Sequence, residues 1–86
     1  MTQEQSSLLL ARRDPSQNVA RFYRIEITPD LFSGVVLIRN WGRIGHRGQE
    51  RQHWFEDRAA ALKEQAVWAR RKQRRGYSMV SDADIP

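Results

Sequence analysis

The triplet Trp41-Gly42-Arg43 combines the residue types in this sequence that are best suited to binding chemistry. An indole ring can stack on a sugar or a base, and a guanidinium can donate two parallel hydrogen bonds to a phosphate. The glycine between them has no side chain and therefore allows close approach. The same residues also fit a structural interpretation, in which Trp41 belongs to the core and Arg43 is a solvated edge residue. The triplet alone leaves both interpretations open.

A second candidate is the cationic run near the C-terminus, which contains Arg70, Arg71, Lys72, Arg74 and Arg75. Arginines in this density can neutralise nucleic-acid phosphates. A solvated helix end explains the run equally well, because cations are favourable at the negative end of a helix dipole. If the run does face a ligand, its four arginines are predicted to contact phosphates together with Arg43 and Arg47.

Enzyme and metal templates do not fit the chain. A mononuclear metal site needs three or four ligands, and His46 and His53 are isolated from each other. The spacing Gly42-x-x-Gly45-x-x-Gly48 lacks the pattern of a dinucleotide or P-loop motif and is typical of a glycine-rich hairpin loop. We therefore expect no catalytic residue, no metal and no cofactor.

Composition and charge indicate an anionic partner. The 86 residues include fifteen Lys and Arg, ten Asp and Glu and no cysteine, which gives a formal net charge of +5 and excludes disulfides, thiolate metal sites and thiol nucleophiles. Between Ser7 and Val80, fifteen cations face seven acids. The apolar runs are only four residues long, and no secretory signal is evident. We expect a cytoplasmic monomer with no membrane partner.

Periodicity predicts an α+β fold, a small antiparallel sheet of about four strands with one C-terminal helix packed on one face. The expected strands are 7–13, 21–28, 35–41 and 49–55. A helix follows Asp57 as N-cap and runs to Arg75, with Gly76 beyond its end. Its buried face is predicted to contain Ala59, Leu62, Ala66 and Ala69, extended by Ala61 and Trp68. Residues 1–6 and the acidic tail 81–86 are expected to be disordered, which leaves a single domain at 7–80.

Several motifs in order resemble the WGR domain, a family named for the triplet found here at 41–43. They are Asn18-x-x-Arg21-Phe22-Tyr23, then Trp41-Gly42-Arg43-Ile44-Gly45 with Gly48, then Phe55, Ala61 and Lys72-x-x-x-Gly76-Tyr77. The resemblance covers about Leu8 to Tyr77. Such domains occur in poly(ADP-ribose) polymerases that respond to DNA damage and as small stand-alone bacterial proteins, to which this chain is most similar.

The resemblance implies roles for individual residues. Trp41 matches the tryptophan that packs against the sugar of a terminal nucleotide. Arg43 matches an arginine at the junction of DNA and a neighbouring domain. Asn18 matches an asparagine near the 5′ phosphate of a break in some members, and Tyr77 matches a position with a structural role. The family fold is a small antiparallel sheet with a helix on one face.

Two functions follow as hypotheses. The first is a non-enzymatic nucleic-acid-binding module, for DNA rather than RNA and for strand ends or nicks. The alternative is a protein-interaction module that docks a separate partner through the edge from Trp41 to Gly48.

Overall fold

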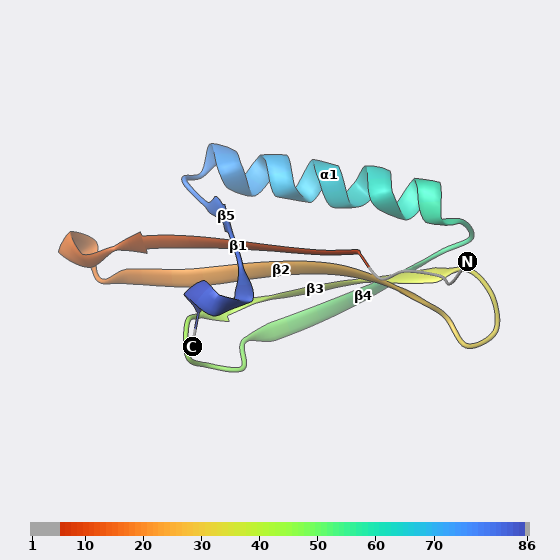
Figure 1. The fold of residues 1–86 in the computed structure, drawn as a ribbon, viewed down its shortest axis with the longest axis horizontal. Helices are drawn as coiled ribbons and strands as arrows, with labels where there is room; N and C mark the ends of the chain where they lie inside the picture. The colour runs from red at the N-terminus through yellow and green to blue at the C-terminus, as the bar shows by residue number, and fades with distance from the viewer. Residues whose placement is uncertain (1–5, 86) are drawn as a thin grey trace.

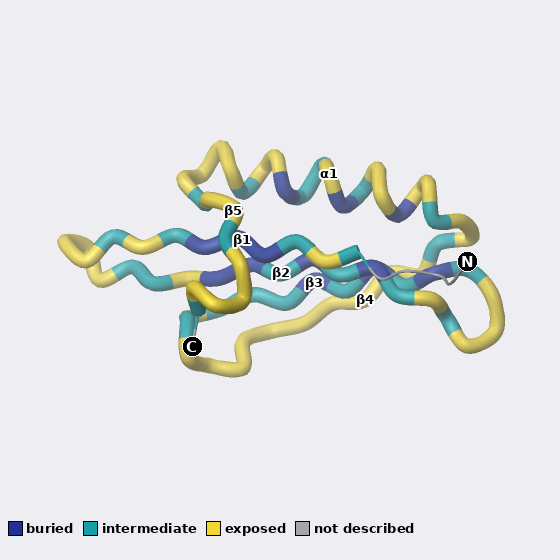
Figure 2. The backbone as a smooth tube through the Cα atoms, in the orientation of Figure 1, coloured by how far each residue is buried: buried dark blue, intermediate teal, exposed yellow. Residues whose placement is uncertain are grey.

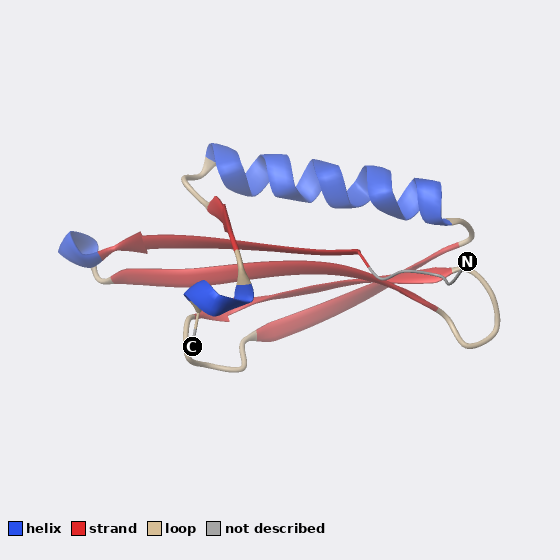
Figure 3. Ribbon diagram, in the orientation of Figure 1, coloured by secondary structure: helices blue, strands red, loops and turns tan. Residues whose placement is uncertain are grey.

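The computed structural model describes residues 6–85 and contains a five-stranded antiparallel sheet with one long helix on one face (Figures 1 and 3). The strands lie in the order β4-β3-β2-β1-β5. The elements are β1 (Ser6–Asp14), the 3-10 turn η1 (Pro15–Gln17), β2 (Val19–Pro29), β3 (Val35–Arg43), β4 (Gln49–Phe55), α1 (Arg58–Arg74), β5 (Ser78–Val80) and the 3-10 turn η2 (Asp82–Asp84). The predicted α+β class is confirmed.

The four predicted strands are all present, and a fifth follows the helix. Strand β4 has the predicted bounds, whereas β1, β2 and β3 extend beyond them. The fifth strand, β5, was missed because three residues are too short to display a period-2 pattern. Gly76, with a φ of 94°, follows the last turn of α1, and β5 then pairs antiparallel with β1.

The core lies between the sheet and α1 (Figure 2). From the sheet it receives alternate residues, among them the fully buried Leu10, Ile25, Ile27 and Leu37. The predicted helix face is confirmed at Ala61, Ala69 and the half-buried Trp68, and it is wrong in its remaining members. The buried helix residues are Ala61, Gln65 and Ala69, whereas Ala59, Leu62 and Ala66 are exposed.

The buried face of the helix has a polar residue, Gln65, at its centre. Its amide nitrogen donates to the carbonyl oxygen of Ile25 at 3.0 Å, and its side-chain oxygen accepts from the Ser6 hydroxyl at 3.2 Å. These bonds satisfy the buried amide. A pattern of apolar residues therefore leaves Gln65 out of the predicted face, because this residue is polar although it is buried between Ala61 and Ala69.

The helix begins at the predicted N-cap. The Asp57 carboxylate accepts a hydrogen bond of 2.9 Å from the backbone nitrogen of Ala60. Replacing Asp57 by alanine is expected to lower the free energy of unfolding by about 1 kcal/mol, measured by urea denaturation, because one terminal N–H loses its partner. Asp57→Asn is the matched control and should retain most of the stability. An equal loss in both variants would contradict the capping role.

The acidic tail differs from its prediction. Residues 81–85 form an ordered turn, in which the Asp84 carboxylate accepts from the backbone nitrogen and the hydroxyl of Ser81. An ion pair of 2.8 Å joins Asp82 to Arg24 on β2 and holds the turn against the sheet. Disorder was expected because this partner is distant in sequence. Residues 1–5 and Pro86 lie outside the described residues, while Ser6 already belongs to β1. Between Ser6 and Ile85, no helix has the length and apolar character needed to cross a membrane.

Candidate nucleic-acid interface

Strand register places the Trp41 region within two rows of side chains that cross the helix side of the sheet. Leu10, Tyr23 and Trp41 lie opposite one another on β1, β2 and β3. Two residues away from these three on each strand, three arginines lie opposite one another in the same way. We call this second set the arginine row; it consists of Arg12, Arg21 and Arg43.

The arginine row brings like charges together without a carboxylate partner. Cations directly opposite one another in a sheet are destabilising. Within residues 6–85, the structure contains one carboxylate ion pair, Arg24 with Asp82, and it lies elsewhere. Uncompensated positive charge at one end of a sheet is the arrangement that an anionic ligand would stabilise.

Trp41 is half-buried beside the arginine row. Its ring stacks on Tyr23 at a centroid distance of 5.8 Å, and Tyr23 in turn stacks on Trp68 of α1 at 6.2 Å. The structural interpretation of Trp41 therefore holds in part, since the ring packs against the core cluster. Trp41 as a whole residue nevertheless keeps part of its surface exposed.

Arg39 is a buried cation that links these rings. Its side chain is only 9% exposed, and the guanidinium lies 4.0 Å from the centroid of Trp68 and 5.5 Å from that of Trp41. It donates to the Tyr23 hydroxyl at 3.0 Å and to Nε2 of His53 at 3.3 Å, while its Nε has no partner. Within residues 6–85, ring contacts and the Tyr23 and His53 side chains thus surround this charge, and no carboxylate pairs with it.

The C-terminal end of α1 adds more positive charge on the same side. A groove of about 450 Å³ is lined by Trp68, Arg71, Lys72, Arg74 and Arg75. The Arg71 guanidinium lies 4.9 Å from the Trp68 centroid. Burial, followed by the charges of Arg75, Arg39 and Arg21, lowers the pKa of Lys72. A bound anion would relieve this repulsion.

Asn18 and Arg43 are brought together by the fold. Asn18 adopts a left-handed conformation with a φ of 56° at the end of the turn between β1 and β2. Arg43 donates to its backbone oxygen at 3.3 Å and to its side-chain oxygen at 3.2 Å. A guanidinium has five donors, so Arg43 keeps others for a ligand.

Gly42 also has a structural reason to lack a side chain. A Cβ at this position would lie 2.8 Å from the Cα of Gly48. The absent side chain therefore lets the loop between β3 and β4 close against the end of β3. Gly48 itself has a φ of 78°, and a Cβ there would overlap the carbonyl oxygen of Trp41. The two glycines fix the backbone that carries Trp41.

Two sequence-predicted residues lie apart from this surface. Arg47 lines a pocket on the opposite face of the sheet, and Arg70 is exposed and lines neither the groove nor that pocket. Conversely, Arg12, Arg21, Arg39 and Lys72 were not predicted as site residues. Arg39 lies two residues before Trp41 on β3 and therefore on the same face, whereas the arginine row is revealed only by the pairing of three strands. Among residues 6–85, no group of three or more His, Cys, Asp or Glu is placed to hold a metal ion.

The comparisons with known proteins identify the family of the chain. The family model of the WGR domain matches residues 6–84. The chain is 43% identical over 70 residues to the uncharacterized protein y4dW of Sinorhizobium fredii (strain NBRC 101917 / NGR234). The aligned residues cover 81% of this chain. The chain spans only 34% of that relative's length. No solved structure matches. With the family model covering nearly every described residue, the chain belongs to the WGR domain family.

Proposed function

We propose that this chain is a non-enzymatic DNA-binding module whose helix-side surface recognises strand ends or nicks. The WGR domain is a nucleic-acid-binding module in poly(ADP-ribose) polymerases, and it is a binding domain rather than a catalytic one. The observation that carries the proposal is the arginine row beside Trp41, where three cations are aligned and none forms an ion pair with a carboxylate of the described residues 6–85.

The helix-side surface consists of the arginine row, Trp41 and the cations at the C-terminal end of α1, and its charged and aromatic side chains have separate roles. The arginine row, with Arg71, Lys72 and Arg75 on the helix, supplies phosphate contacts that do not depend on sequence. Trp41 supplies a ring for a sugar or base that is exposed where a strand is interrupted. Asn18 holds the Arg43 guanidinium at the edge of this surface.

Salt dependence tests the electrostatic part of the proposal. Contacts to roughly four to six phosphates predict that log K falls with log[salt] at a slope of about −4 to −5. The measurement is a titration of short duplexes, nicked and intact, at two salt concentrations. A flat dependence would contradict phosphate neutralisation. Absence of binding even at low salt would instead favour docking of a protein partner at the edge from Trp41 to Gly48.

A further inference from the structure

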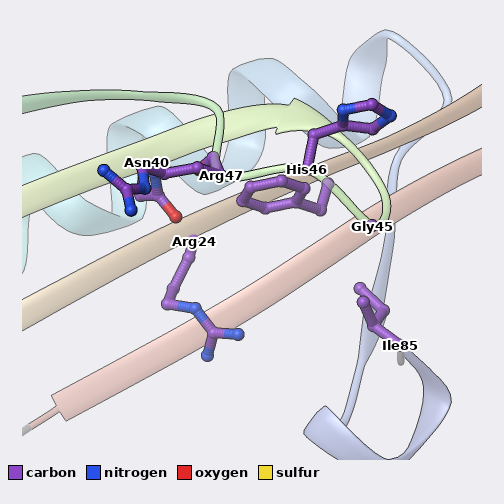
Figure 4. A pocket seen from close by; sticks show the side chains of 7 residues that line it. Arg24, Asn40, Gly45, His46, Arg47 and Ile85 are labelled. Carbon is purple, nitrogen blue, oxygen red and sulfur yellow. The ribbon is translucent and has the colours of Figure 1, made fainter.

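The face of the sheet away from α1 contains a second basic pocket (Figure 4). Its volume is about 320 Å³, at the lower end of the range for small-molecule sites. Phe22, Arg24 and Asn40 alternate with Tyr23 and Trp41 along β2 and β3, so they point to the opposite face. The full lining, which we call the back-face pocket, is Phe22, Arg24, Asn40, Gly45, His46, Arg47 and Ile85.

The back-face pocket offers both donors and an acceptor. Arg24 and Arg47 supply guanidinium groups, and His46 adds a ring. The Asn40 amide nitrogen donates to the backbone oxygens of Arg47 at 3.2 Å and Gln49 at 2.8 Å, which fixes the orientation of the amide. Figure 4 shows the side-chain oxygen turned toward the backbone end of the Arg24 side chain, whose guanidinium extends away from Asn40. Cationic groups and a fixed amide oxygen in the lining of one pocket suit a phosphate carried on a group with hydrogen-bond donors.

One of the cations that line the pocket, Arg24, already has a carboxylate partner. The Asp82 carboxylate pairs with Arg24 at 2.8 Å, and the Asp82 side chain is 78% exposed. Its turn is also held by Arg13, which donates to the Asp84 backbone oxygen at 3.0 Å. The Arg24 side chain is 27% exposed, so it is the carboxylate side of the pair that solvent reaches, and an anion from solution can compete with Asp82 there.

We propose that the back-face pocket binds the phosphate of a nucleotide and that Asp82 acts as a tethered competitor. Displacement of Asp82 leaves the two charges of Arg24 and Arg47 for a dianionic phosphate. Glu50 lies opposite Asn40 on β4, and its carboxylate, which accepts from Gln52 at 3.0 Å, is a negative charge on this face that opposes anion binding. The nucleotide is either free or part of a strand. This site is separate from the helix-side surface and does not depend on it.

The test uses the full chain labelled with ¹⁵N and titrated with adenosine monophosphate or with a 5′-phosphorylated oligothymidylate. We expect amide signals of Gly45, His46 and Arg47 to shift. Asp82→Asn should tighten binding about two- to fivefold, because the neutral side chain no longer competes with the phosphate for Arg24, and the lost ion pair is a weak one. Arg47→Gln should abolish the shifts. Shifts with the monophosphate indicate a free nucleotide, and shifts with the oligonucleotide alone indicate a strand.

Separate controls distinguish this site from the proposed function. Trp41→Ala should leave binding of the monophosphate unchanged while it weakens duplex binding, and Arg70→Gln should affect neither the pocket signals nor their titration. The proposal is overturned if neither ligand shifts the pocket signals, or if Asp82→Asn binds no more tightly than the natural sequence. Failure of duplex binding at the helix-side surface would not alter either result.

Discussion

Replacing Arg12, Arg21 and Arg43 together by glutamine is expected to weaken duplex binding on the order of 10²-fold at about 0.1 M salt, because three phosphate contacts are lost. The salt slope should become shallower by about 3 for the same reason. Stability should stay constant or rise, since these like charges lie opposite one another across β1, β2 and β3. Fluorescence titration and urea denaturation measure the two quantities on the same protein.

A matched triple variant separates position from net charge. Arg13→Gln, Lys63→Gln and Arg70→Gln remove the same charge from residues that line neither the groove on α1 nor the back-face pocket. This control should lose less than about tenfold in duplex affinity, because only general attraction declines. Equal losses in both triple variants would show that binding follows net charge and would contradict a localised surface.

Trp41→Ala is expected to weaken binding to nicked duplex by about 5- to 150-fold, because stacking of an aromatic ring on a base contributes roughly 1–3 kcal/mol. Binding to an intact duplex should weaken less, since that duplex exposes no terminal sugar or base. Some loss of stability is also expected, because Trp41 stacks on Tyr23 and contacts Arg39. Titrations should therefore be carried out well below the unfolding midpoint of the variant.

Trp54→Ala is the control for loss of a tryptophan. Trp54 lies on β4 and is 55% exposed, and its register partner is Val36 rather than a residue of the Trp41 row. Its removal should leave both duplexes bound as before. If Trp41→Ala weakened nicked and intact duplexes equally, recognition of strand ends would be wrong while general binding would remain.

The fold was largely predictable from local patterns. The alternation of Tyr23, Ile25 and Ile27 located β2, and Asp57 correctly marked the start of α1. What failed was part of the predicted helix face, because Gln65 is buried through hydrogen bonds to Ile25 and Ser6 that no hydropathy pattern contains. The ordered tail likewise depends on Arg24, more than fifty residues away from its partner Asp82.

The sequence was sufficient to choose the central residues of the candidate site, but it did not indicate which other cations lie on the same surface. Aromatic and cationic residue types singled out Trp41 and Arg43, and the fold does place Asn18 against Arg43. Arg12 and Arg21 were not predicted because a single arginine within a strand indicates no binding site. Only the strand register shows that the two residues lie in line with Arg43. Arg47 was assigned to the same surface by proximity in sequence, although the loop between β3 and β4 directs it to the other face.

The three tryptophans provide the most direct test of the helix-side surface. Trp41 and Trp68 lie on that surface, whereas Trp54 donates its indole N–H to the Ser33 backbone oxygen at 3.0 Å, away from it. In ¹⁵N-labelled full chain titrated with a short nicked duplex at low salt, the indole signals of Trp41 and Trp68 should shift while that of Trp54 stays in place. A shift of Trp54 alone, or no indole shift at saturation, would contradict the proposed interface.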